Sequence, residues 1–246
     1  MKSLVSTIAF LALASMANVA HSAGGLIQKL PKDGEWVSYY FEMKGKARQQ
    51  EQTMTGTFTI KSVGSVMENG EKCRWIEIEM KGEEGGKKRS HLSKILVREK
   101  DFAPGSKNLG RIVRGWKRSS AKAQLKELTE NEKSGSGDMA MLIGGKLSDE
   151  KVLKTKKVVD YQKGQLKIAQ GTTGKFEMKM PGKVPKDFKY DMTQSVWPHK
   201  NVPFGIAVLE INMKLTVKEM VVMNMKMTFT LQNQGVGAKS QLPDKK

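Results

Sequence analysis

The clearest pattern in the sequence is a strict alternation of apolar and polar residues near its C-terminal end. Every second residue is apolar from Leu209 to Val217, and the same alternation returns from Met223 to Leu231. A period of two is typical of a β-strand that buries one face. Two such runs joined by a short connection predict an antiparallel hairpin with one apolar face. Because an isolated hairpin is marginal in water, that face needs cover from protein, lipid or a partner.

The N-terminal half predicts four more strands in an antiparallel meander. Runs rich in aromatic and β-branched residues cover 36–43 and 53–63, and strands at 72–80 and 91–98 follow. Asn69-Gly70 marks a hairpin turn, because this dipeptide readily adopts the positive φ angles that a type I′ turn requires. Strands resume after residue 151 and lead to the C-terminal hairpin.

The pattern changes over residues 101–148. Leu109, Ile112, Val113 and Trp116 follow the i, i+3, i+4, i+7 spacing of an amphipathic helix. We therefore expect a central helical insertion that packs on the concave face of the sheet. Its other side is basic, and five residues there are candidates for contact with an anionic surface: Arg111, Arg114, Lys117, Arg118 and Lys122.

These elements together predict a mainly β protein of the α+β kind. The expected architecture is a single curved antiparallel sheet or half-barrel, formed by one domain at 23–234. A chain of this length can bury a core large enough for one β domain. Residues 235–246 are rich in glycine and charge, and we expect this tail to fray.

The first 22 residues have the pattern of a secretory signal peptide. Lys2 supplies the positive start, residues 4–14 the apolar run, and Ala20-His21-Ser22 the cleavage site. We expect a mature chain that starts near Ala23 and is exported to the periplasm or the extracellular space. No later run approaches the roughly 20 apolar residues of a membrane-spanning helix, so no transmembrane segment is expected.

Charge and cysteine content narrow the expected partners. The formal net charge is +18, which favours contact with anionic lipid headgroups or acidic envelope polymers, although lysines spread over many strands also serve solubility. Export argues against nucleic acid as a partner. Cys73 is the only cysteine, which excludes an intramolecular disulfide, and we expect it to be a small apolar strand residue.

No catalytic or metal-binding motif is present in the sequence. The two histidines that follow the signal, His91 and His199, stand apart from each other and from Cys73, with no H-x-x-x-H or C-x-x-C spacing. A nucleophile elbow, a phosphate loop and a dinucleotide-binding fingerprint are also missing. We therefore expect a protein that is not an enzyme and that holds neither a cofactor nor a metal.

Methionine use suggests where a ligand would bind. Unbranched thioethers adapt to apolar partners of variable shape, whereas a rigid core more often uses Leu, Ile and Val. The same methionines are also compatible with ordinary core filling, so both interpretations remain open. The candidate ligand-binding residues are those on one face of the hairpin, with two aromatic residues expected at the mouth: Met213, Met223, Met225, Met227 and Phe229, with Trp197 and Phe204.

The order of elements resembles the lipoprotein-carrier superfamily typified by LolA and LolB. The resemblance consists of a meander, a central insertion, a returning meander and the passage from Trp197-Pro198 to Pro203-Phe204-Gly205 before the last hairpin. It implies a half-barrel whose concave side takes acyl chains. No functional residue of that family can be matched to a position here, and the chain is more basic than such carriers.

Two functions are therefore expected from the sequence. The first is binding of an apolar or amphiphilic ligand, a lipid or an acylated protein, in a methionine-rich concave face. The alternative is an envelope scaffold or adhesion module whose basic surface contacts anionic polymers or lipid headgroups.

Overall fold

The computed structural model describes most of the chain that follows the predicted signal. The described residues are 24–47, 50–103, 112–120, 123–133, 147–176 and 187–242. The signal at 1–22 and the expected cleavage point lie outside them.

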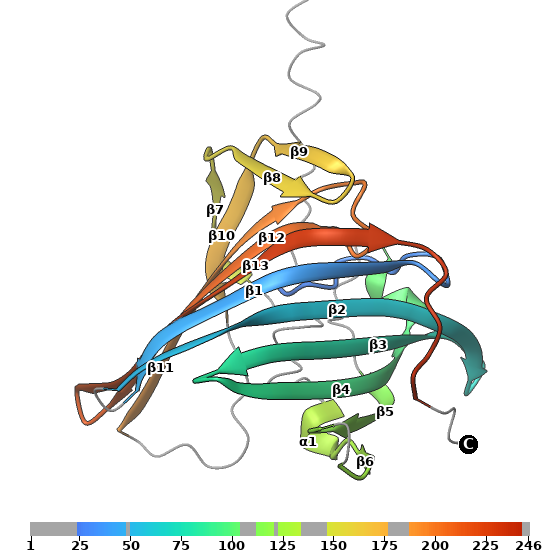
Figure 1. Ribbon diagram of the computed structural model, residues 1–246, viewed down its shortest axis with the longest axis horizontal. Helices are drawn as coiled ribbons and strands as arrows, with labels where there is room; N and C mark the ends of the chain where they lie inside the picture. The colour runs from blue at the N-terminus through green and yellow to red at the C-terminus, as the bar shows by residue number, and fades with distance from the viewer. Residues whose placement is uncertain are drawn as a thin grey trace, which may run out of the picture.

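One antiparallel sheet of 11 strands, which is not closed, dominates the described chain (Figure 1). A separate two-stranded hairpin consists of β8 (Lys157–Tyr161) and β9 (Gly164–Ile168). The order across the large sheet is β6 (Lys126–Glu127), β5 (Ile112–Arg118), β4 (Lys87–Arg98), β3 (Glu71–Glu84), β2 (Gln50–Glu68), β1 (Trp36–Ala47), β13 (Met220–Gly235), β12 (Ile206–Val217), β11 (Phe188–Pro198), β10 (Gly171–Phe176) and β7 (Leu147–Leu153).

The prediction of a mainly β, antiparallel fold is confirmed. The two alternating C-terminal runs form β12 and β13, and the register pairs Leu209 with Phe229 and Ile211 with Met227. Facing partners in an antiparallel pair lie on the same side of the sheet, so the apolar residues of both strands share one face. Asn69 and Gly70 both have positive φ, 50° and 77°, as the predicted hairpin turn requires.

The prediction of a central helical insertion is wrong for the described residues. Ile112–Arg118 forms β5 and pairs with the outer edge of β4. Described helical structure within 101–148 is limited to the 3-10 turn η1 (Glu99–Phe102) and the one-turn helix α1 (Glu130–Lys133). The helical spacing was misleading because the free edge of β4 offers hydrogen-bond partners to the backbone of this segment, and this tertiary context outweighs local periodicity.

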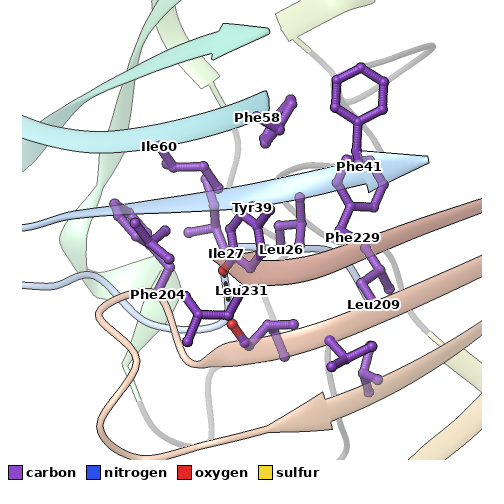
Figure 2. Packing of buried hydrophobic residues seen from close by; sticks show 14 of the residues in the cluster. Leu26, Ile27, Tyr39, Phe41, Phe58, Ile60, Phe204, Leu209, Phe229 and Leu231 are labelled. Atoms are coloured by element: carbon purple, nitrogen blue, oxygen red, sulfur yellow. Dashed lines mark hydrogen bonds between the residues drawn. The ribbon is translucent and has the colours of Figure 1, made fainter. Parts of the chain in front are cut away.

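The main core lies on one face of the sheet, here called the inner face. It is the face that carries Val37, Tyr39 and Phe41 of β1, all of which are buried. Side chains from strands on both sides of β1 join the same cluster (Figure 2). The opposite side of the sheet is the outer face.

An N-terminal segment, residues 24–30, packs on the inner face and is called the N-terminal strap. Leu26 and Ile27 are 0% and 1% exposed and lie near Tyr39 and Leu231 (Figure 2). The backbone N–H of Gln28 donates a hydrogen bond to the backbone carbonyl of Phe204 at 3.0 Å. The strap therefore supplies part of the cover that an apolar sheet face requires.

The first residue of the strap must be small. A Cβ atom on Gly24 would lie 2.7 Å from Oε1 of Gln194 and 2.8 Å from Cδ2 of Phe176, closer than such atoms approach one another. The next residue, Gly25, donates its backbone N–H to the same Gln194 oxygen at 3.0 Å. Glycine at the start of the strap thus allows the backbone to approach the side chains of β10 and β11 closely.

The β8–β9 hairpin covers part of the outer face. Gln162, just after β8, donates its backbone N–H to Gln232 of β13 at 3.0 Å. The Lys157 ammonium lies 4.5 Å from the centre of the Trp197 ring and 2.7 Å from a Glu210 oxygen, and both of these residues are on the outer face. The hairpin therefore shields this end of the outer face from water.

The C-terminal tail covers another part of the outer face. Glu77 is fully buried, and its carboxylate accepts hydrogen bonds from the backbone N–H groups of Gln241 and Leu242 at 2.8 and 3.2 Å. The buried Lys94 donates to the Leu242 carbonyl at 3.2 Å. The described part of the tail, through Leu242, therefore supplies hydrogen bonds to two buried charged side chains. Fraying of the tail stays a prediction.

The strap makes a testable contribution to stability. Replacing Leu26 with Ala should lower the free energy of unfolding by about 2–5 kcal/mol, because it removes most of a fully buried side chain and leaves a cavity in its place. Lys32→Ala, just after the strap and exposed, should change it by less than about 0.5 kcal/mol. Urea denaturation measures both, and equal midpoints for the two variants would show that the strap does not contribute to the core.

Candidate ligand-binding face

Methionines gather at one end of the inner face, which we call the methionine end. The register brings them together: Met43 of β1 faces Met54 of β2 on one side and Met227 of β13 on the other. In the next row, Met213 of β12 faces Met225 of β13 and Met192 of β11. The methionine end consists of Met43, Met54, Met192, Met213, Met223, Met225 and Met227.

Burial decreases along this face. Met192 and Met227 are buried, whereas Met213, Met223 and Met225 are only half-buried. The face therefore changes from closed core to partly accessible apolar surface.

An aromatic group borders the methionine end on the side of the strap. Phe229 packs edge-on against Phe58, with ring centres 5.4 Å apart, and lies 6.1 Å from the ring of Phe41 (Figure 2). Beyond these rings, the Tyr39 hydroxyl donates to the Ile206 carbonyl at 2.9 Å, and burial raises the pKa of this hydroxyl well above its usual value. The aromatic group thus separates the strap-covered core from the methionine end.

Two polar side chains of β11 interrupt the apolar character of the inner face. Tyr190 faces Leu215 of β12, and its buried hydroxyl oxygen has no hydrogen-bond partner. Burial raises the pKa of Tyr190 to about 12. Four residues further along, Gln194 is 0% exposed and faces Ile211.

The structure brings together most of the predicted ligand-binding residues. Met213, Met223, Met225, Met227 and Phe229 share the inner face across β12 and β13, as the alternation predicts. Whether they bind a ligand stays a prediction.

The two aromatic residues that we expected at the mouth lie elsewhere. Phe204 is fully buried beside the strap, in the loop that precedes β12, at the far end of the hairpin from Met223. Trp197 is on the outer face, where its indole N–H donates to the Thr155 carbonyl at 3.1 Å. We placed Trp197 by its proximity to the hairpin. Alternation along β11 puts Val196 on the inner face and therefore Trp197 on the outer face.

The predicted basic strip is not a single surface. Arg111 and Lys122 lie outside the described residues. Arg114 and Lys117 are on opposite faces of β5, and they pair with Glu68 and Glu132, respectively. Arg118 ends the strand and is half-buried. A strand alternates its side chains between faces, so residues that a helix would align are separated here.

Sequence reasoning missed Met43, Met54, Met192 and Tyr190 as members of this face. Each occupies an alternating position of its own strand, which was a visible signal. What the sequence did not show is that β1 pairs with β13 and places the first strand beside the last one.

Other candidate groups have ordinary structural roles. A cavity of about 320 Å³ next to Cys73 is lined largely by charged residues, and burial raises the pKa of the Cys73 thiol, which disfavours the reactive thiolate. His91 contacts the Ser93 hydroxyl at 2.9 Å, and His199 Nδ1 accepts the Asn201 amide at 3.3 Å.

Neither a metal-binding cluster nor a membrane-spanning helix is found in the described ranges. Within them, no group of three or more His, Cys, Asp or Glu side chains is placed to hold a metal ion. Within the same ranges, no helix has the length and apolar character needed to cross a membrane.

Comparison with known proteins yields only distant similarities. No protein-family model and no curated protein sequence matches the chain. Among solved structures, a putative lipoprotein from Parabacteroides distasonis is similar over 85% of this chain and 98% of its own, with a TM-score of 0.35 and 8% identity. A putative oleoyl thioesterase from Lactobacillus plantarum covers 82% of this chain and 78% of its own, with a TM-score of 0.15 and 8% identity. TM-scores this low do not establish a shared fold.

The surroundings of Tyr190 predict a pH effect on stability. The folded state holds the hydroxyl proton up to about pH 12, whereas an unfolded tyrosine releases it near pH 10. Ionisation of this group therefore leaves stability unchanged below about pH 10. It contributes a loss of stability as the pH rises from 10 towards 12, because the folded state disfavours the charged form. Tyr190→Phe lacks this contribution, so its free energy of unfolding should fall less than that of the wild type between about pH 9 and pH 11.5. Urea denaturation at both pH values measures the difference, and parallel losses would contradict the assignment.

Proposed function

We propose that this protein is a non-enzymatic binding protein for an apolar or amphiphilic ligand, a lipid or an acylated protein, held at the methionine end. The main support is the burial gradient on the inner face, which leaves Met213, Met223 and Met225 half-buried although they adjoin a closed core. An apolar chain laid along these residues would complete their burial, at about 0.8 kcal/mol for each buried CH₂ group.

The chemistry of the methionine end favours a ligand of variable shape. Thioether side chains are unbranched and polarizable, so they can repack around different chains with little strain. The aromatic group of Phe41, Phe58 and Phe229, whose rings pack against one another, forms the boundary of the site on the side of the strap. The expected signal peptide would export the protein to a compartment with abundant acyl chains in membranes and lipoproteins.

Binding is tested with an environment-sensitive apolar probe, N-phenyl-1-naphthylamine. Wild-type protein should bind the probe, and Met225→Asp should weaken binding at least tenfold, because a carboxylate on an apolar face must remain hydrated.

The matched control is Asn224→Asp, which introduces the same charge one residue away on the exposed outer face. It should bind the probe like the wild type. Equal binding by all three proteins would place the probe elsewhere, and no binding by folded wild type would refute the proposed site.

Binding to an anionic lipid surface is the second candidate function. Lys44 of β1 and Lys226 of β13 face each other on the outer face. Both are exposed, and each also has a carboxylate neighbour, Glu42 at 2.8 Å from Lys44 and Glu210 at 3.9 Å from Lys226. At the start of β13, next to the turn that carries Lys218, Met220 and Val221 are 67% and 51% accessible. Exposed apolar residues beside lysines suit a membrane interface.

This candidate predicts salt-dependent binding to vesicles that contain anionic phospholipid. Lys44→Gln with Lys226→Gln should reduce binding by roughly thirtyfold, at about 1 kcal/mol for each lysine near an anionic membrane. The control, Lys163→Gln with Lys167→Gln, removes the same charge from the exposed β8–β9 hairpin and should bind nearly as the wild type does. Co-sedimentation measures all three proteins, and equal losses in both variants would indicate only a general effect of net charge.

A further inference from the structure

The unpaired hydroxyl of Tyr190 identifies a specific feature of the methionine end. Its oxygen is enclosed and makes no hydrogen bond, although the rest of the side chain is half-buried. On the inner face its neighbours by register and strand position are Leu215 of β12, Met223 beyond it on β13, and Met192 two residues along β11. None of these side chains is a strong hydrogen-bond acceptor.

An enclosed hydroxyl without a partner is unfavourable in the free protein. Its desolvation costs about 1–3 kcal/mol, and phenylalanine in the same place would avoid this cost while packing equally well. An unsatisfied group of this kind needs an explanation, and binding a ligand is one of the few that fit a partly accessible apolar site.

Gln194 is a second polar group on the same strand and face. Its side-chain carbonyl oxygen accepts the Gly25 backbone N–H, and its amide nitrogen contacts the Met192 sulfur, a weak acceptor, at 3.9 Å. Tyr190 and Gln194 therefore flank Met192 with hydrogen-bond donors that lack strong acceptors. Four residues of strand separate them, about 13 Å.

The charge of the surroundings limits the ligand chemistry. The inner-face positions around Tyr190 on β11, β12 and β13 are apolar, and the lysines of these strands, Lys189, Lys214 and Lys226, occupy the alternating positions of the outer face. Among the described residues of β11, β12 and β13, no inner-face cation would compensate the desolvation of an ionised phosphate or carboxylate at Tyr190. A neutral carbonyl requires only a donor.

We propose that the ligand is an acyl chain with a neutral ester or amide carbonyl, and that Tyr190 donates a hydrogen bond to that carbonyl oxygen. This inference rests on the proposed function and names the ligand class of the same site. The chain then lies along Met213 and Met225, and Tyr190 distinguishes an acyl group from a plain hydrocarbon. In the free protein the hydroxyl is enclosed and unpaired. The ligand reaches it when the adjacent methionine side chains repack, and binding then relieves an existing cost.

The test compares two ligands of similar length that differ in the carbonyl. Methyl dodecanoate and n-tetradecane are each used to displace N-phenyl-1-naphthylamine from the wild type, Tyr190→Phe and Tyr40→Phe. Tyr40 is the matched control because it lies on the outer face and is 45% exposed. Urea denaturation of Tyr190→Phe should show stability equal to or above that of the wild type at neutral pH, which excludes loss of folding.

The expected result is selective for the ester. Tyr190→Phe should bind methyl dodecanoate about five- to tenfold more weakly than the wild type does, the effect of one net hydrogen bond, and should bind the alkane within about twofold of wild type. Tyr40→Phe should match the wild type for both ligands.

The other outcomes separate this inference from the proposed function. If the wild type binds both ligands and Tyr190→Phe retains ester binding, or loses ester and alkane equally, the role of Tyr190 is refuted while the apolar site stands. If neither ligand displaces the probe, or the folded wild type binds no probe, both the inference and the proposed function are refuted.

Discussion

The pairing of β1 with β13 is the constraint on which the rest of the structure depends. It joins the N-terminal meander to the C-terminal hairpin in one continuous sheet, with Tyr39 opposite Leu231 and Met43 opposite Met227. Without this long-range pairing each half would expose a strand edge and an uncovered apolar face. With it, the apolar residues of both halves form a single inner face, and the core and the candidate site are two ends of that face.

The two ends differ because they are covered differently. The N-terminal strap buries Leu26 and Ile27 against one end, where the Tyr39 hydroxyl also finds a backbone partner. The other end carries flexible thioethers that stay half-buried and a tyrosine hydroxyl that stays unpaired. A structure that closes one end with its own chain and leaves the other adaptable is consistent with a binding protein whose site is continuous with its core.

The outer face shows how a basic chain accommodates buried charge. Glu77 and Lys94 are fully buried, and the C-terminal tail forms hydrogen bonds with both. Glu77 also pairs with Lys61 at 3.4 Å. The β8–β9 hairpin meets the other half of the outer face through Lys157, Glu210 and Trp197. These contacts explain why the β8–β9 hairpin and the C-terminal tail, although polar in sequence, pack on the outer face. A buried charge needs hydrogen-bond partners in the protein, because water no longer supplies them.

The sequence by itself determined the strands and their faces wherever alternation was strict. The β12–β13 hairpin and the shared face of Met213, Met225 and Phe229 follow directly from the period of two, as does the turn at Asn69-Gly70. Tertiary structure alone decided that Ile112–Arg118 is a strand and that the pairing of β1 with β13 places Met43 beside the methionines of the last hairpin. These outcomes depend on which strand edges meet, and such long-range pairings leave no local periodicity in the sequence.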